Sequence, residues 1–231
     1  MHKKILLLAA LTPLSVHAAL TADLEVVSDY RSGGISYSDK GPAFQPGLYY
    51  SHDSGVYAST WATNVDYGGN DKTNLEWDFY LGFYKDLNPD IAVDVGYASY
   101  TYHGADYSKD YAYAEIYLGI VLPSNTKVYW NHTDDFFGLG VSHDILKVIQ
   151  DYTLNEYLLS ATFGYELSAD KNKYAWDENK ADYQYIMLSA AREYSGFMFK
   201  LTASATTIDK DFNKNADPTL VLSVKRSFDL N

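Results

Sequence analysis

Asn74 to Lys85 reads NLEWDFYLGFYK, and its side chains alternate between two kinds. One parity is large and apolar: Leu75, Trp77, Phe79, Leu81 and Phe83. The other parity is polar, small or hydroxylated: Asn74, Glu76, Asp78, Tyr80, Gly82 and Tyr84. Successive side chains of a β-strand point to opposite faces, so a period of two indicates a strand. This stretch therefore predicts a strand with one apolar face and one polar face.

The same period recurs along the chain, most clearly over 112–122, 157–167 and 197–206. Tight turns such as Asn88-Pro89-Asp90 and Tyr194-Ser195-Gly196 separate some of these segments. Longer polar connections separate the others, at about 30–42, 67–73, 103–110, 168–181 and 208–218. Alternating short and long connections are typical of an up-and-down barrel with periplasmic turns and external loops. A Greek-key sandwich has no reason to produce this order.

The strand count is clear except in one segment. We expect strands near 22–29, 43–52, 55–66, 74–85, 91–102, 111–122, 126–132, 155–167, 182–194, 197–207 and 218–229. Bacterial single-chain barrels have an even number of strands, so one more is expected within 136–152, where DILKVIQ also fits a short helix. The sequence therefore predicts an all-β fold: a transmembrane up-and-down antiparallel β-barrel of about 12 strands, with about 10 as the alternative.

Such a barrel solves the problem of crossing a membrane without an apolar helix. Closure pairs every backbone group and leaves no free edge, while the apolar faces contact lipid. Aromatic side chains near strand ends suit the two interfacial girdles of a membrane barrel. We expect in these girdles Tyr49, Tyr50, Tyr57, Trp61, Trp77, Tyr100, Tyr102 and Trp130.

The first residues have the pattern of a secretory signal peptide. MHKK supplies positive charge, ILLLAALTPLSV is a short apolar run, and Val16-His17-Ala18 places small residues at a cleavage site. We expect residues 1–18 to be a signal peptide and residues 19–231 to form a single outer-membrane barrel domain. The chain has no cysteine, which excludes a disulfide scaffold, and its net charge of -12 argues against binding to nucleic acid.

Residues 28–67 contain a dense series of short motifs. They are Ser28-Asp29-Tyr30-Arg31, Gly34-Ile35-Ser36-Tyr37-Ser38-Asp39, Pro42-Ala43-Phe44-Gln45, Ser54-Gly55-Val56-Tyr57 and Trp61-Ala62-Thr63-Asn64-Val65-Asp66. In this order they resemble the TorF porin family of proteobacterial outer membranes. The chain departs from the family pattern at Gly33, where a second basic residue is usual, and at Pro46, where glycine is usual. The resemblance implies an outer-membrane β-barrel and a pore, without an established substrate.

If the apolar parity faces lipid, the opposite parity faces the lumen. The predicted lumen-lining residues are Glu25, Asp29, Glu76, Asp78, Tyr80, Asp94, Tyr113, Glu115, Tyr117 and Lys200. One interpretation is an acidic constriction that favours cations, because charged rings select ions by sign. The other is polar filling of a narrow barrel, with carboxylates bonded to tyrosines or paired with Lys200 and Lys225. The inward tyrosines fit either stacking on a flat solute or filling of space.

Two further patterns offer weaker support for chemistry. Residues 209–217 place oxygen ligands at alternate positions, as a calcium loop does, but lack the glycine and the final acidic residue of such a loop. The histidines His52, His103, His132 and His143 lie outside any nucleophile elbow or zinc signature, and no Ser-His-acid set is expected at matched depth. We therefore expect no metal, no cofactor and no enzyme activity, and a barrel hydrolase remains the least favoured alternative.

The sequence thus predicts a porin-like channel in the cell outer membrane for diffusion of small solutes, cations among them. The alternative is a non-conducting barrel whose external loops bind a ligand or partner. Expected partners are outer-membrane lipids, lipopolysaccharide and small solutes. The alternating last strand, 220–230 with Phe228 near its end, also suits recognition by the barrel-assembly machinery. The sequence leaves the oligomeric state open.

Overall fold

The chain forms a closed barrel of twelve antiparallel strands in the computed structural model, which describes residues 18–230. Each barrel strand pairs with its neighbours in the chain, and β1 closes the barrel by pairing with β14. The barrel strands are β1 (Ala19–Val27), β4 (Ala43–Ser51), β5 (Val56–Asn64), β6 (Leu75–Asn88), β7 (Ile91–His103), β8 (Tyr113–Val121), β9 (Thr126–Thr133), β10 (His143–Leu154), β11 (Tyr157–Ser168), β12 (Asp182–Tyr194), β13 (Phe197–Thr206) and β14 (Thr219–Asp229).

The predicted all-β barrel of about twelve strands is confirmed, and the missing strand is β10. Its alternation is blurred because the outward residues include Asp144 and Gln150, whereas Ile145 and Ile149 point inward. Pairing with β11 along its whole length compensates for this weak pattern. DILKVIQ is therefore strand rather than helix, and the helical turn of this region lies earlier, at η2 (Phe136–Gly138).

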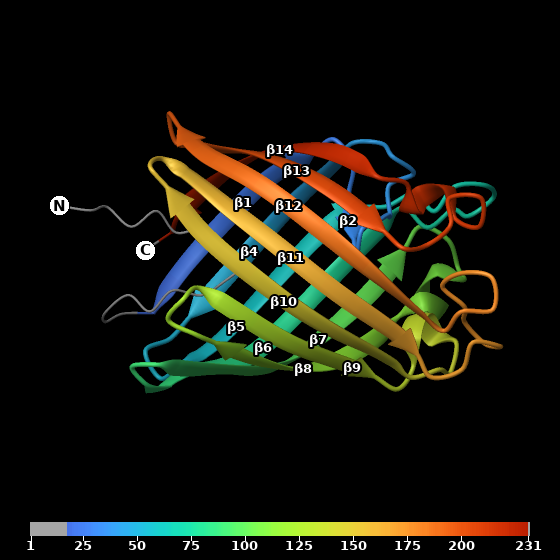
Figure 1. Ribbon diagram of the computed structural model, residues 1–231, viewed down its shortest axis with the longest axis horizontal. Helices are drawn as coiled ribbons and strands as arrows, with labels where there is room; N and C mark the ends of the chain where they lie inside the picture. The colour runs from blue at the N-terminus through green and yellow to red at the C-terminus, as the bar shows by residue number, and fades with distance from the viewer. Residues whose placement is uncertain (1–17, 231) are drawn as a thin grey trace.

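The two ends of the barrel differ, as Figure 1 shows. Five short turns and the ends of β1 and β14 lie at one end, which we call the turn end. Six longer connections lie at the other, the loop end. We number them loop 1 (28–42), loop 2 (65–74), loop 3 (104–112), loop 4 (134–142), loop 5 (169–181) and loop 6 (207–218).

Loop 1 contains a small hairpin of β2 (Arg31–Ser32) and β3 (Ile35–Ser36), and loops 3 and 6 contain the helical turns η1 (Ser108–Tyr111) and η3 (Lys214–Ala216). The predicted signal peptide, apart from Ala18, lies outside the described residues. No helix among residues 18–230 is long and apolar enough to cross a membrane.

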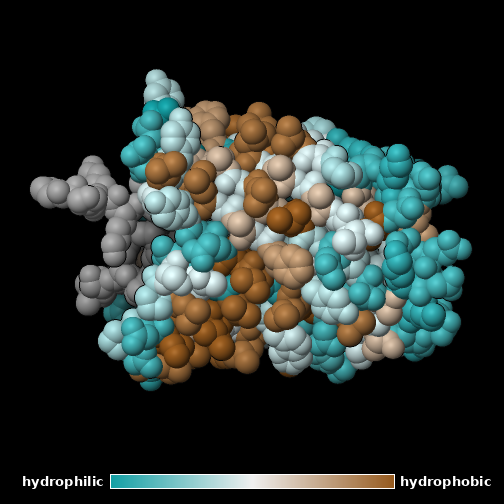
Figure 2. All heavy atoms as spheres, in the orientation of Figure 1, coloured by the Kyte–Doolittle hydropathy of each residue, from teal (hydrophilic) through white to brown (hydrophobic). Residues whose placement is uncertain are grey.

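The outer surface of the barrel is apolar around its middle. Leu81 is 58% exposed and Leu118 is 44% exposed, as expected for side chains that contact lipid rather than a protein core. Figure 2 shows hydrophobic residues gathered over the strands, with hydrophilic residues covering the loop end. The outward parity predicted from NLEWDFYLGFYK is the parity observed, because Trp77, Phe79 and Leu81 are exposed whereas Glu76 and Asp78 are buried.

The predicted aromatic girdles are partly wrong. Tyr50, Trp77 and Trp130 are exposed on the outer surface. Five others have the inward parity of their strands and face the lumen: Tyr49, Tyr57, Trp61, Tyr100 and Tyr102. The physical reason is that these side chains fill a narrow barrel, and Tyr57, Tyr100 and Tyr102 also donate hydrogen bonds to its buried carboxylates. Composition alone does not distinguish this use from an interfacial one.

Candidate functional site: the acidic lumen and its loop-end plug

One wall of the lumen carries four carboxylates, from Glu76 and Asp78 on β6, Asp94 on β7 and Glu115 on β8. All four side chains point inward and are 2% to 7% exposed. They lie on adjacent strands because the chain has the same polar parity in three consecutive segments. The predicted acidic residues of these strands are therefore brought together on one wall.

Neutral hydroxyl and amide groups solvate this wall. Tyr57 and Tyr129 donate hydrogen bonds to the two oxygens of Asp94, at 2.6 and 3.0 Å, and the Tyr57 hydroxyl lies 2.5 Å from that of Tyr117. Further along the wall, Glu115 Oε2 accepts hydrogen bonds from Tyr100 and Asn131, Asp78 from Tyr80 and Glu76 from Tyr102. These bonds compensate in part for the loss of water around each buried carboxyl group.

No lysine or arginine of the described chain forms an ion pair with these four carboxylates. One oxygen of Glu76, Oε2, and one of Asp78, Oδ1, also lack a hydrogen-bond partner. The opposite side of the barrel differs, because Lys200 on β13 lies 3.4 Å from Glu25 and Lys225 on β14 lies 2.5 Å from Asp23. The lumen therefore has an uncompensated acidic wall facing a wall of matched charges.

The loop-end half of the lumen is closed to water. The inward side chains of Thr63, Glu76, Tyr102, Thr133 and His143 are only 1% to 3% exposed. Around them an aromatic cluster packs loops 1, 4, 5 and 6 against the barrel wall. Its members are Ile35, Tyr37, Tyr113, Phe136, Phe137, Val141, Tyr174, Trp176, Tyr183, Tyr185, Met187, Ile208 and Ala216.

The wall formed by β1, β13 and β14 is more open. The inward side chains of Lys200, Lys225 and Glu25 on it are 32%, 20% and 18% exposed. Water thus reaches this ion-paired wall but not the aromatic cluster. We call loop 1 and this cluster the plug.

Asp29 does not lie on the barrel wall as predicted, because β1 ends at Val27 and Asp29 belongs to loop 1. Its carboxylate accepts hydrogen bonds from Ser36 Oγ at 2.5 Å and Ser38 Oγ at 3.3 Å, and pairs with Arg31 at 3.0 Å. The strand ends early because Ser28 caps the pairing with β14, donating to and accepting from the Leu222 backbone. Asp29 is thus a folding element of loop 1.

Arg31 joins loop 1 to loop 6. Its guanidinium donates to the backbone oxygens of Gly34 at 2.9 Å, Asn215 at 2.7 Å and Asp217 at 2.8 Å, and its side chain is 4% exposed. Two ion pairs outside this contact repeat the connection, Lys40 with Asp217 at 2.7 Å and Lys214 with Asp39 at 3.2 Å.

The remaining motif residues hold loop 1 against the barrel wall and loop 2. The Tyr30 ring contacts the Trp61 ring at 5.4 Å, and the Tyr37 backbone oxygen accepts a hydrogen bond from Asp66 N. Asn64 accepts from Phe44 N and donates to the Pro42 oxygen, which fixes the end of the loop. Ile35 and Ser36 are buried, and the Gln45 side chain donates a hydrogen bond to the Thr63 hydroxyl. Gly34 has a φ of 81° and lies against Thr206 and Tyr185. The sequence indicated the loop but carried no signal that it folds into the lumen.

Two titratable groups of the loops have shifted pKa values. Burial raises the pKa of Tyr37 well above its ordinary value, and nearby Tyr174, Tyr67 and carboxylates raise it further. The hydrogen bond from Lys40 lowers the pKa of Asp217 below the usual 3.8. Asp217 is therefore ionised near neutral pH, where it pairs with Lys40 of loop 1.

The calcium-like segment of loop 6 is occupied by protein contacts. Asp209 and Asn213 accept hydrogen bonds from Asp211 N and Asn215 N, and two of the segment's backbone oxygens bind Arg31. Within residues 18–230 no cluster of His, Cys, Asp or Glu has metal-binding geometry. The side-chain oxygens of Asp209 and Asn213 thus bind the loop's own backbone, while Arg31 is bound by backbone oxygens.

One histidine does lie beside a serine and an acid, contrary to the sequence-based expectation. His143 pairs directly with Ser168 across β10 and β11, and its Nε2 lies 3.3 Å from Glu166. This set was missed because β10 was the strand that the pattern left unassigned. The Ser168 hydroxyl donates to the Asp170 oxygen, and neither ring nitrogen of His143 has a hydrogen-bond partner, so the group is not arranged as a nucleophile and base.

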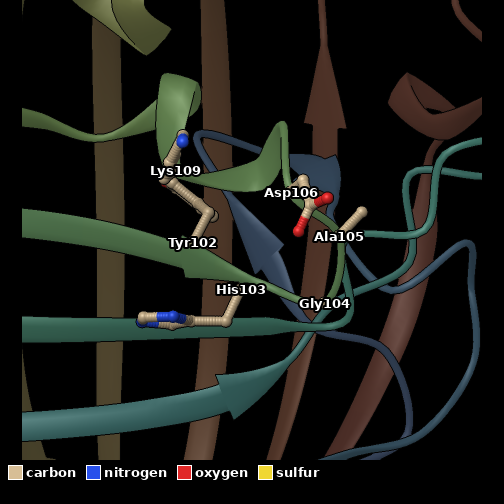
Figure 3. Close-up of a pocket in the computed structure, with 6 residues that line it drawn as sticks. All are labelled: Tyr102, His103, Gly104, Ala105, Asp106 and Lys109. Carbon is tan, nitrogen blue, oxygen red and sulfur yellow. The ribbon is translucent and has the colours of Figure 1, made fainter.

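A separate open pocket of about 400 Å³ lies at the loop end, where β7 leads into loop 3. Figure 3 shows His103, Asp106 and Lys109 around it, from the strand end, the loop and η1 respectively. Its lining includes one acidic side chain, Asp106, and one basic side chain, Lys109, so the pocket has no single ionic preference.

Solved structures of similar fold are outer-membrane porins. A NanC porin aligns with a TM-score of 0.61 at 11% identity, covering 91% of this chain and 100% of that one. A KdgM porin aligns with a TM-score of 0.58 at 9% identity, covering 90% of this chain and 99% of that one. A KdgM porin in complex with disordered oligogalacturonate aligns with a TM-score of 0.56 at 9% identity, covering 91% of this chain and 99% of that one. At such identities the likeness shows a shared barrel fold.

No curated protein sequence matches this chain significantly. A family model described as "Bacterial protein of unknown function (Gcw_chp)" matches residues 11–228, nearly the whole chain, including the motifs of loop 1. The chain therefore belongs to the Gcw_chp family of bacterial proteins.

Proposed function

We propose that the protein is a porin-like channel of the outer membrane that passes small solutes, with a preference for cations. The loop end faces the cell exterior and the turn end faces the periplasm, as in other bacterial barrels. The barrel has the fold of the NanC and KdgM porins, and its loop 1 motifs resemble those of the TorF porin family. Expected surroundings are outer-membrane lipids and lipopolysaccharide.

The observation that carries the proposal is the acidic wall. Glu76, Asp78, Asp94 and Glu115 face the lumen with neutral donors alone around them. A charged wall in a narrow pore attracts ions of opposite sign and repels others. One oxygen each of Glu76 and Asp78 lacks a hydrogen-bond partner and lies buried beneath the plug, so it contacts a cation or its water only when the loop-end half of the lumen is open.

The test is ion selectivity in planar bilayers. Under a potassium chloride gradient, the purified full chain should give current steps whose reversal potential favours potassium. The triple variant Glu76→Gln, Asp78→Asn and Glu115→Gln should move the reversal potential toward zero. The matched control, Glu25→Gln with Lys200→Gln, removes a paired charge of each sign and should leave it unchanged. An unaltered reversal potential in the triple variant would dismiss the selectivity assignment.

A second candidate is a non-conducting barrel whose external loops bind a ligand or partner. The observation in its favour is the buried plug, which closes the loop-end half of the lumen. Absence of current steps in the native protein and in variants that release the plug would reject the channel and favour this candidate.

A further inference from the structure

The plug is made by a loop that crosses the mouth of the barrel. Loop 1 leaves β1 and returns to β4, yet its Gly33 oxygen accepts a hydrogen bond from Tyr183 on β12 at 3.0 Å. On other sides its Tyr30 ring contacts Trp61 on β5, and its Tyr37 ring contacts Phe137 of loop 4 at 6.2 Å. Loop 1 therefore occupies the middle of the mouth.

Among the polar contacts between loop 1 and loop 6, one side chain makes the most hydrogen bonds. Arg31 uses Nε and Nη1 within loop 1, on the Gly34 oxygen and the Asp29 carboxylate. It uses Nη2 between loops, on the Asn215 and Asp217 oxygens. These four oxygens form a cradle that matches the planar fork of a guanidinium.

We propose that Arg31 is an autoinhibitory latch, and that the four-oxygen cradle is a guanidinium-binding site occupied by the chain's own side chain. While Arg31 fills the cradle, loop 1 is bound to loop 6 and the lumen is closed at its outer end. When Arg31 leaves, loop 1 loses its main polar contact with loop 6 and swings out of the mouth. This inference rests on the proposed channel, whose regulation it describes.

The surroundings of loop 1 favour a movable plug over a fixed core. Its attachments to loop 6 are polar contacts between the loops together with the packing of Ile35 in the aromatic cluster, and no hydrogen bond of barrel pairing is lost when they break. The buried Ser204 hydroxyl beneath Gly34 has no partner, and neither has Asn215 Oδ1 beside the cradle. These groups gain water when the loop moves away, which offsets part of the cost of opening.

The first experiment measures access beneath loop 1 without relying on conduction. The chain has no cysteine, so Ser204→Cys provides a single thiol under Gly34. A charged thiol reagent should label it slowly in the otherwise native chain and roughly tenfold faster or more when Arg31→Ala is added, since several charge-assisted bonds are lost. The matched control is Arg192→Ala, which removes an exposed arginine paired with Glu156 at the turn end and should not change the rate.

The second experiment restores the missing group. Guanidinium chloride at millimolar concentration should slow labelling in Arg31→Ala and reduce its single-channel opening, whereas potassium chloride at equal ionic strength should do neither. Gly33→Ala separates this rescue from simple pore block. It disturbs loop 1 because φ is 55° and a methyl group would collide with Tyr183 and Glu166, yet it keeps Arg31 in place. Guanidinium should leave the single-channel opening of the Gly33→Ala variant unaffected.

The outcomes separate the latch from the channel. Faster labelling in Arg31→Ala without any current would support the latch and reject the channel. Equal labelling and equal conductance in the native and Arg31→Ala proteins would overturn the latch while the channel stands. Folding of each variant is checked by the altered gel mobility of an unheated barrel. Arg31→Lys, which keeps the charge and loses the fork, should be intermediate.

Discussion

At the residue scale, the lumen is organised by hydroxyl groups around carboxylates. Asp94 receives two tyrosine donors and Glu115 receives a tyrosine and an amide, which explains why an inward face holds so many aromatic side chains. Each bond replaces water that the narrow barrel excludes. The same principle applies at Asp29, where two serines and Arg31 surround a loop carboxylate.

Replacing Asp29 with Asn should loosen loop 1. The amide presents a donor where Ser36, Ser38 and Arg31 now donate, so at least one bond is lost and opening of the loop becomes easier by about 1–3 kcal/mol. Trypsin cleavage after the buried Arg31 should therefore accelerate by at least about fivefold in the folded protein. Cleavage after the exposed Lys171 of loop 5 is the internal reference, and an unchanged ratio of the two rates would refute the role of Asp29.

Replacing Tyr57 with Phe should destabilise the barrel through Asp94. The change removes the 2.6 Å bond to this carboxylate and the contact with Tyr117, leaving Tyr129 as its sole donor. The expected loss is about 1–3 kcal/mol in the free energy of unfolding, measured by denaturant titration in lipid vesicles. Tyr50→Phe, on the outer surface, is the comparison and should have little effect.

At the element scale, each strand is defined by the contrast between its two faces. β8 places Ile116, Leu118 and Ile120 outward and Tyr113, Glu115 and Tyr117 inward. Strand pairing also fixes which side chains face outward in a strand whose own pattern is weak, because β10 is held in register by β9 and β11 on its two sides. A shift by one residue would turn every apolar side chain of a strand into the lumen.

Substitution of Leu118 by Arg should therefore be costly. Leu118 lies near the middle of β8 on the outer surface, where a lipid-facing arginine costs about 2–4 kcal/mol at the membrane midplane. Ser189→Arg, on the inward face near the middle of β12, should cost much less because its side chain faces the polar lumen instead of lipid. Equal losses of stability for the two variants, by denaturant unfolding in vesicles, would contradict the assigned faces.

At the scale of the whole molecule, two parts of the lumen differ in their access to water. The wall formed by β1, β13 and β14 carries partly exposed charged pairs, whereas the loop end is filled by loop 1 and by aromatic residues from loops 4 and 5. Loop 1 and loop 6 are far apart in sequence, yet Arg31, Lys40 and Lys214 connect them. The state of the mouth therefore depends on contacts between the two ends of the chain.

The connection between loops 1 and 6 should tolerate mild acid and weaken in strong acid. Lys40 lowers the pKa of Asp217 below 3.8, so this pair contributes stability above that pH and loses it as the pH falls through the lowered value. Labelling of Ser204→Cys, normalised to an exposed Ser195→Cys, should be the same at pH 8 and pH 5 and should rise below about pH 4. Adding Lys40→Met should reduce the pH-dependent change, and a rise already at pH 5 would show that other groups control the loop.

The sequence by itself determined the barrel, because alternation of apolar and polar residues is a local property that pairing does not alter. It placed eleven of the twelve strands, the inward parity of Glu76, Asp94 and Glu115, and the alternation of turns with loops. Only the tertiary structure decided where the loops go and which aromatic residues point inward. Arg31 meets carbonyl groups of loop 6, nearly two hundred residues away, and backbone oxygens have no sequence signature. The plug results from such long-range contacts, so a local pattern of residues could not reveal it.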